Sequence, residues 1–158
     1  MERTFAMMKP DAIQRRLVGR IVSRIEEKGL RLAGLKLVKV DRAKAEQLYS
    51  IHKGRPFYEG LVAFVASSPV VVMVLEGVEA IKIWRTLMGG VANKTSGREA
   101  ENGSIRGDFG MSKGFNLVHG SDSPESAARE IPLFFGKDEL VGWSPTDEQW
   151  VYEAPERG

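Results

Sequence analysis

The chain has 158 residues, a formal net charge of +2 and no cysteine. A chain of this length suits one domain that buries a core without a covalent staple. The lack of cysteine excludes disulfides, thiolate metal ligands and cysteine nucleophiles, and it is typical of an intracellular protein. The near-neutral charge argues against a nucleic-acid partner, because such partners need a basic stripe. We therefore expect a single cytoplasmic domain over residues 1–158.

The sequence predicts neither a signal peptide nor a membrane span. Charged residues at positions 2 and 3 precede a short apolar stretch that Lys9 ends, and the longest apolar run, Val70–Leu75, has the length of a strand. The two histidines lie far apart and do not form a zinc-binding pattern. We expect no membrane association and no metal held by the protein's own side chains.

Apolar residues alternate in some segments and recur at helical spacing in others, which predicts strands and helices in turn. Local signals mark several boundaries: Gly29 ends one helix, Asp41 caps the next, and Ser123-Pro124 starts another. The expected strands are 3–8, 30–40, 70–75 and a short run that ends at His119, and the expected helices cover about 17–28, 42–49, 55–66, 78–88 and 124–135.

This order of elements predicts an α+β fold of the ferredoxin-like βαββαβ kind, with a four-stranded antiparallel sheet covered by helices. The first and third strands are the most uniformly apolar, so we expect them to be the inner strands. Periodicity vanishes between Gly89 and Gly114, where glycine recurs among polar residues, which predicts a long glycine-rich loop without regular structure. The aromatic tail from Asp138 to Glu153 is expected to pack against the body or another subunit.

The candidate nucleophile is His119, in the segment Phe115-Asn116-Leu117-Val118-His119-Gly120-Ser121-Asp122. The apolar run before it is typical of a strand, Gly120 allows a tight turn, and the helix start that follows offers backbone N–H groups that favour anions. By default, a lone histidine at the end of an apolar run is a core or interface residue. Asn116 lies three residues earlier, so on a regular strand the two side chains project to opposite faces unless a bend intervenes.

Three basic residues, Lys9, Arg85 and Arg106, stand where predicted elements end or in the glycine-rich loop. By default each is a solvated surface charge. Three basic side chains beside one nucleophile would instead be suited to binding the phosphates of a nucleoside triphosphate. Transfer of its terminal phosphoryl group depends on positioning and charge neutralisation, for which lysine, arginine and Mg²⁺ are the usual means. Phe57 offers a stacking face for a base and Tyr49 a hydroxyl near the imidazole, although both are core residues by default. The chain has no Walker loop or Rossmann fingerprint, so side chains and loops have to form the phosphate site.

The segment Asn116–Asp122 resembles the active-site signature of the nucleoside diphosphate kinases. The similarity continues through four further blocks that span nearly the whole chain: Met8-Lys9-Pro10-Asp11-Ala12, Arg55-Pro56-Phe57-Tyr58, Ile105-Arg106-Gly107-Asp108-Phe109 and Glu125-Ser126-Ala127-Ala128-Arg129-Glu130-Ile131. The resemblance implies nucleoside tri- and diphosphates as substrates, and a homohexamer, with a tetramer as the alternative assembly.

The resemblance also implies a role for each matched residue. His119 would take the phosphoryl group from a triphosphate as phosphohistidine and return it to a diphosphate in the same site, in a ping-pong reaction. Only the neutral imidazole has a lone pair for attack, and Glu130 would fix its other ring nitrogen. Mg²⁺ would be bound mainly through the nucleotide phosphates. The remaining roles are phosphate binding by Lys9, Arg85 and Arg106, sugar contacts by Lys9 and Asn116, Tyr49 near the imidazole, Phe57 on the base and His52 in the phosphate region.

The sequence departs from the family pattern at two places. The family's phosphate-binding threonine is expected six residues after the arginine matched by Arg85, which gives Val91, and eleven before the one matched by Arg106, which gives Thr95. The loop is therefore longer by four residues, and we favour Thr95, because a valine side chain cannot donate to a phosphate. Lys113 stands where the family commonly places an aliphatic contact to the base, and its methylene stem could pack there.

Two other functions are compatible with parts of the sequence. A nucleotide-binding phosphohistidine relay module, with little turnover, would use the same residues with an altered loop. A nucleic-acid platform on the sheet face is disfavoured by the near-neutral charge and by the lack of a sheet-face aromatic pattern.

Overall fold

The computed structural model describes residues 1–90 and 95–157. One antiparallel sheet has the strand order β2-β3-β1-β4. This order confirms the ferredoxin-like α+β fold, and the first and third strands are the inner ones, as the sequence predicts. The strands are β1 (Glu2–Met8), β2 (Arg31–Val38), β3 (Val70–Gly77) and β4 (Val118–Gly120).

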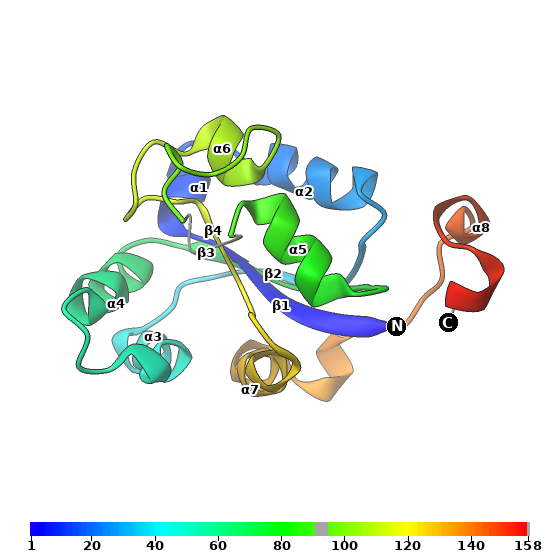
Figure 1. The fold of residues 1–158 in the computed structure, drawn as a ribbon. Coiled ribbons are helices and arrows are strands. Elements are labelled where there is room, and N and C mark those ends of the chain that lie inside the picture. The colour runs from blue at the N-terminus through cyan, green and yellow to red at the C-terminus, as the bar shows by residue number, and fades with distance from the viewer. Residues whose placement is uncertain (91–94, 158) are drawn as a thin grey trace.

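Helices cover both faces of the sheet (Figure 1). Each face has its own apolar core. One face carries α1, α2, α5 and α6, and the opposite face carries α3, α4 and α7 (Figure 1). The helices are α1 (Pro10–Gln14), α2 (Val18–Glu27), α3 (Arg42–Leu48), α4 (Tyr58–Ala66), α5 (Ala80–Met88), α6 (Ile105–Phe109), α7 (Pro124–Phe134) and α8 (Glu148–Val151).

The inner strands are buried on both faces, which explains their uniformly apolar sequences. In β1, Phe5 and Met7 belong to the core under α3, α4 and α7, whereas Ala6 and Met8 belong to the core under α2 and α5. This alternation follows the two-residue period of a strand. The end of β1 is thereby fixed in the middle of the sheet, next to β4.

Local capping signals in the sequence are confirmed. The Asp41 side chain accepts a hydrogen bond from the Lys44 N–H at 2.8 Å, and the Ser123 side chain accepts one from the Ser126 N–H at 3.1 Å, with a proline as the first residue of α7. Gly29 follows α2 at a φ of +92°, the left-handed conformation of a glycine that ends a helix.

The prediction that Gly89–Gly114 lacks regular structure is wrong, because α6 lies within this range. Ser104 caps α6 by accepting a hydrogen bond from the Gly107 N–H at 3.0 Å. The sequence also gave no sign of α1, where a simple end of the first strand was expected. Both helices have five residues, little more than one turn, so their apolar residues have no room to repeat.

The C-terminal segment packs against the body of its own chain. The Val141 N–H donates to the Ala33 carbonyl at 2.8 Å, and the Trp143 indole N–H donates to the Leu32 carbonyl at 2.9 Å. The segment therefore covers part of the outer edge of β2, which satisfies edge groups that would otherwise lack partners.

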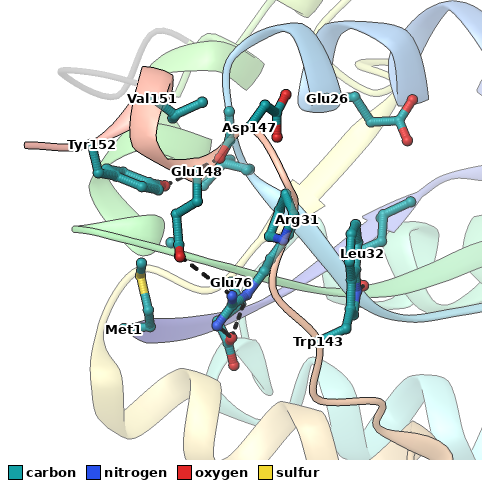
Figure 2. A pocket seen from close by; sticks show the side chains of 14 residues that line it. Met1, Glu26, Arg31, Leu32, Glu76, Trp143, Asp147, Glu148, Val151 and Tyr152 are labelled. Carbon is teal, nitrogen blue, oxygen red and sulfur yellow. Dashed lines mark hydrogen bonds and ion pairs between the residues drawn. The ribbon is translucent and has the colours of Figure 1, made fainter. Parts of the chain in front are cut away.

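A cavity of about 200 Å³ lies between this C-terminal segment and the start of β2 (Figure 2). Arg31 lies between Glu76, with which it forms an ion pair, and Glu148, whose carboxylate oxygen is 3.7 Å from the guanidinium. None of the residues that line the cavity is among the candidate site residues from the sequence. Among the residues that the structure describes, no helix is long and apolar enough to cross a membrane.

Candidate active site

His119 lies on β4, an outer strand, opposite Met7 of β1. Its Nε2 is 3.1 Å from a carboxylate oxygen of Glu130, which α7 presents from the next segment of the chain. Because a carboxylate accepts hydrogen bonds, this contact favours the imidazole tautomer with its hydrogen on Nε2. In that tautomer Nδ1 keeps its lone pair, so the ring has a nucleophilic nitrogen.

Glu130 is itself held from two sides. The Ser121 hydroxyl donates to the oxygen that contacts His119, at 2.7 Å, and Arg129 donates to the other oxygen, at 3.1 Å. Burial alone would raise the pKa of Glu130, but its hydrogen bond to His119 and the contacts of Ser121 and Arg129 outweigh burial and lower it. Glu130 therefore stays ionised at neutral pH and fixes the imidazole.

Ser121 and Arg129 were not singled out from the sequence, although both lie in segments that resemble the family. The available signal was spacing: Ser121 is two residues after His119 on an extended segment, and Arg129 precedes the carboxylate directly.

Tyr49 packs edge-on against the imidazole, with ring centroids 5.6 Å apart. Its hydroxyl is buried and has no hydrogen-bond partner among the residues that the structure describes. Burial and the negative charge of Glu130 raise the pKa of the hydroxyl, so it stays protonated. A buried donor without a partner is costly, and a ligand oxygen beside His119 would satisfy it.

Lys9 and Arg106 are buried cations, and their hydrogen bonds to the described residues all end on uncharged oxygens. The Lys9 ammonium donates to the Asn116 amide oxygen at 2.7 Å, and Arg106 donates to the backbone carbonyls of Asn116, Val118 and Gly89 at 3.1, 2.7 and 3.4 Å. Burial and the charge of Arg106 lower the pKa of Lys9 to about 7. Buried positive charge of this kind favours a polyanionic ligand.

Arg85 comes to the same place from α5. It donates to the Gly90 carbonyl at 3.0 Å, and a Cβ atom at Gly90 would lie 3.4 Å from the Arg85 guanidinium and 3.5 Å from that of Arg106. Burial and the positive charge of Arg85 lower the pKa of Arg106 to about 10. The structure thus brings Arg85 and Arg106 together, and brings Lys9 and Arg106 together through Asn116.

The backbone bends between Asn116 and His119. The strand begins only at Val118, and Leu117 has a φ of +71°. The Asn116 amide thereby contacts Lys9 on one side and donates to the Thr95 carbonyl at 3.0 Å on the other.

Gly120 does not form the tight turn that the sequence suggested. It is the last residue of β4 and pairs with Ala6. A Cβ atom there would lie 2.3 Å from the Trp84 indole nitrogen, which donates to the His119 carbonyl at 3.2 Å. Glycine is therefore required by the close approach of Trp84 behind the nucleophile's strand.

The aromatic residue expected to contact a base is accessible. Phe57, just before α4, is 54% exposed, and its ring centroid is 5.3 Å from that of His52. His52 in turn stacks on Tyr49 at 6.3 Å, so a row of rings leads from Phe57 toward His119.

Two loop predictions are not tested by this geometry. Thr95 reaches Asn116 with its backbone carbonyl, which leaves the role of its hydroxyl open to experiment, and Val91 lies outside the described residues. Lys113 is exposed, as is expected of a lysine that keeps its ammonium in water.

The protein has a ferredoxin-like fold, a histidine oriented by a carboxylate, and buried cations in the same site. This combination is suited to phosphoryl transfer. Comparison with known proteins makes this specific. The profile of the family described as "Nucleoside diphosphate kinase" matches residues 2–140. The chain belongs to the nucleoside diphosphate kinase family.

Relatives and solved structures agree with this assignment. A nucleoside diphosphate kinase of Archaeoglobus fulgidus is 52% identical to this chain over 153 residues, which cover 97% of this chain and 99% of the relative. A nucleoside diphosphate kinase of Bacillus licheniformis is 54% identical over 152 residues, which cover 96% of this chain and 100% of the relative. The structure of a halophilic nucleoside diphosphate kinase from Halobacterium salinarum in complex with CDP superimposes with a TM-score of 0.91 at 47% identity, covering 96% of this chain and 99% of that one.

Proposed function

We propose that this protein transfers the terminal phosphoryl group of a nucleoside triphosphate to a nucleoside diphosphate through a phosphohistidine on His119. The observation that carries the proposal is the 3.1 Å contact of His119 Nε2 with Glu130, which leaves Nδ1 as the nitrogen with a lone pair. Membership of the nucleoside diphosphate kinase family supports it, as does the enzyme name of the relatives from Archaeoglobus fulgidus and Bacillus licheniformis.

The reaction then has two half-reactions that mirror each other. The Nδ1 lone pair attacks the γ-phosphorus, the bond from that phosphorus to the bridging oxygen breaks, and the nucleoside diphosphate leaves with the bond electrons. In the second half, a terminal oxygen of the acceptor diphosphate attacks the phosphorus, and the nitrogen–phosphorus bond breaks to restore the imidazole. Glu130 stabilises the positive charge that the ring acquires when Nδ1 is phosphorylated.

Lys9, Arg85 and Arg106 are proposed to neutralise the phosphate charge. A guanidinium has five N–H donors, and Arg106 uses three of them for backbone carbonyls of the described residues. The two donors that these residues leave unused are proposed to bind a phosphate. The Tyr49 hydroxyl, which has no hydrogen-bond partner among the described residues, is proposed to donate near the transferred group. These groups are already in place, so their stabilisation of the transition state needs little reorganisation.

The nucleoside is proposed to lie toward Phe57. Its exposed ring offers a stacking face for the base, and Lys9 and Asn116 are proposed to contact the sugar hydroxyls. The Thr95 hydroxyl is proposed to contact a phosphate, which is consistent with the backbone contact between Thr95 and Asn116. The Halobacterium salinarum relative, solved in complex with CDP, supports a nucleotide ligand.

We propose that Mg²⁺ enters as part of the substrate, coordinated mainly by the nucleotide phosphates. The described residues include no group of three or more His, Cys, Asp or Glu side chains that could hold a metal ion, and the site presents cations instead. A homohexamer, with a tetramer as the alternative, and a cytoplasmic location remain our proposals. Light scattering checks the assembly.

The experiment is incubation with γ-labelled ATP, followed by acid and alkali treatment and by addition of GDP. We expect acid-labile, alkali-stable label that passes to GDP. His119→Ala and His119→Gln should abolish the label while the circular dichroism spectrum stays native, and His52→Gln should still acquire it. Labelling without transfer would identify the phosphohistidine relay module instead, and retained transfer in either His119 variant would exclude the covalent mechanism.

A further inference from the structure

The backbone immediately before β4 contains a strained residue. Leu117 is fully buried and has a φ of +71°, a region that side chains larger than glycine rarely adopt. The Val118 N–H donates to the Asn116 carbonyl at 2.8 Å, which closes a three-residue γ-turn with Leu117 at its centre. A γ-turn with a positive φ at its central residue is rare and strained. Such a conformation persists only where its surroundings hold it.

Both backbone groups of Leu117 are held by the junction between β1 and α1. Its carbonyl accepts a hydrogen bond from the Lys9 N–H at 2.8 Å, and its N–H donates to the Asp11 carboxylate at 3.0 Å. The Asp11 contact crosses 106 residues of sequence, so it does not arise from local chain folding. Asp11 is the only side chain to which the Leu117 backbone is hydrogen-bonded among the residues that the structure describes.

The turn has a direct consequence for the site. Residues three apart on a regular strand point to opposite faces. With Leu117 in the left-handed conformation, Asn116 instead turns its amide to the Lys9 ammonium at 2.7 Å, while His119 faces Glu130. If the Leu117 N–H lost its acceptor, we expect the turn to relax toward an extended strand and the Asn116 amide to lose its contact with Lys9.

The other oxygen of Asp11 is buried and has no hydrogen-bond partner among the described residues. The carboxylate is therefore not held by a network of its own, and its charge supports the protonated form of Lys9. A carboxylate that served only the first turn of α1 would be better placed in water.

We propose that Asp11 is a positioning residue of the phosphotransfer site, which holds Leu117 in its left-handed conformation and thereby aligns Asn116 with His119. The inference rests on the proposed function, because it takes phosphorylation of His119 as the reaction that the alignment serves. Asp11 acts through Leu117 and need not touch the transferred group.

The test compares Asp11→Ala, Asp11→Asn and, as a matched control, Asp41→Ala. Asp41 also gives a carboxylate acceptor to one backbone N–H, that of Lys44 at 2.8 Å, but at the start of α3. The measurement is the second-order rate constant for labelling of His119 by γ-labelled ATP in a single turnover, which is the kcat/KM of this half-reaction. It is measured across a range of pH, together with the melting temperature of each variant. Hydrogen exchange of the Leu117 amide gives a readout that does not depend on catalysis.

Asp11→Ala should lower the maximum of the kcat/KM profile by about 100-fold, the size that misplacement of a reacting group causes. It should also speed exchange of the Leu117 amide. Asp11→Asn keeps an acceptor oxygen, so the maximum should stay within about threefold of wild type. Its alkaline limb should move to lower pH, because Lys9 loses a supporting negative charge. Asp41→Ala should lose stability and leave the profile and the Leu117 amide unchanged.

Three outcomes would overturn the proposal. The maximum of the kcat/KM profile could stay at the wild-type value in Asp11→Ala, or Asp11→Asn could lower it as much as Asp11→Ala does. The third is a Leu117 amide exchange rate that Asp11→Ala leaves unchanged. If Asp11→Ala does not fold, Asp11→Glu replaces it, because the longer side chain keeps the charge but displaces the acceptor. Asp11→Glu should then lower the maximum of the kcat/KM profile, whereas Asp11→Asn should leave it near the wild-type value. A lower maximum in Asp11→Asn than in Asp11→Glu would refute the proposal. A wild-type protein that takes no label would refute the proposed function alone, and the amide exchange comparison would still test the role of Asp11.

Discussion

The Lys9 ammonium and the Asn116 amide oxygen are hydrogen-bonded at 2.7 Å, although 107 residues separate them in the sequence. Both side chains are almost fully buried, at 6% exposure each. The amide oxygen is neutral, so it gives Lys9 a partner without balancing its charge. The pKa of Lys9 therefore falls to about 7, from burial first and the charge of Arg106 second. This pairing makes Lys9 sensitive to pH near neutrality and to any anion that enters the site.

Nucleotide binding should take up a proton at Lys9. A bound phosphate favours the charged ammonium, so the pKa of Lys9 should rise from about 7 on binding. Above pH 7 the free protein has mostly neutral Lys9, and its affinity for a nucleoside diphosphate should fall as pH rises. Calorimetric titration at pH 8, in buffers of different ionisation enthalpy, measures the uptake directly. Lys9→Met should lack the Lys9 component of this uptake, and an uptake equal to that of wild type would assign the proton to another group.

Lys9 should also lower the stability of the free protein. Its pKa is 10.5 in the unfolded chain and about 7 in the folded one, so between these values the unfolded state binds the extra proton. Stability should therefore rise with pH through this window, by up to about 1.4 kcal/mol per pH unit. Lys9→Met should be more stable than wild type by about 1–4 kcal/mol at pH 7, by analogy with the replacement of a buried ion pair by apolar groups. This advantage should shrink toward pH 10.

Urea unfolding of wild type and Lys9→Met at several pH values between 6 and 10 checks this expectation. Lys82→Met is the control, because the Lys82 side chain is 73% exposed and its replacement should change stability little at any pH. A constant difference between wild type and Lys9→Met across the range would mean that Lys9 does not change its charge there.

Glu130→Gln should slow phosphorylation of His119 by about 10- to 100-fold, by analogy with the loss of a partner that orients a metal-binding histidine. The amide can donate as well as accept, so it no longer fixes the hydrogen of His119 on Nε2. Single-turnover labelling measures the loss. Glu125→Gln, on an exposed residue in the first turn of the same helix, is the control and should label at the wild-type rate. Equal rates in both variants would remove Glu130 from the mechanism.

The sequence predicted those features that depend on neighbouring residues. The caps at Asp41 and Ser123 and the turn at Gly29 follow from local chemistry, and the apolar inner strands follow from burial on both faces. The γ-turn at Leu117 could not be predicted, because nothing in a leucine signals a positive φ and the hydrogen bonds that hold it come from Asp11 and Lys9, far away in the chain.

The same limit applies to the candidate site. The resemblance to the family supplied the individual residues, and the contacts between them required the fold. Arg106 is expected from the sequence to bind phosphates, and the structure shows its guanidinium donating to the backbone carbonyls on both sides of Leu117, which the sequence did not indicate. Gly120 was interpreted as a turn residue, whereas its real constraint is Trp84, which comes from α5.

Phe57→Ala should weaken binding of ATP, GTP, CTP and UTP to a similar extent. An exposed ring that stacks on a base contributes about 1–3 kcal/mol whatever the base, which corresponds to roughly 5- to 150-fold in affinity. KM and kcat with the four triphosphates test this. Trp150→Ala, at an 82% exposed aromatic residue on α8, is the control and should change neither. A loss confined to one base would show that Phe57 contributes to base selection rather than to general stacking.

The final prediction concerns the threonine in the lengthened loop. Thr95 accepts a hydrogen bond from Asn116 through its backbone carbonyl, and Thr95→Val leaves that carbonyl in place while it removes only the hydroxyl. If the hydroxyl donates to a phosphate, the variant should lose about 1–3 kcal/mol of nucleotide binding or transition-state stabilisation, as is typical of a hydrogen bond to a charged group. Val91→Thr is the matched reverse change at the other candidate position and should have little effect. Steady-state kinetics and nucleotide titrations of both variants decide between the two positions. A silent Thr95→Val together with a faster Val91→Thr would show that the extra residues follow position 91, and that this protein works without the threonine its family usually has.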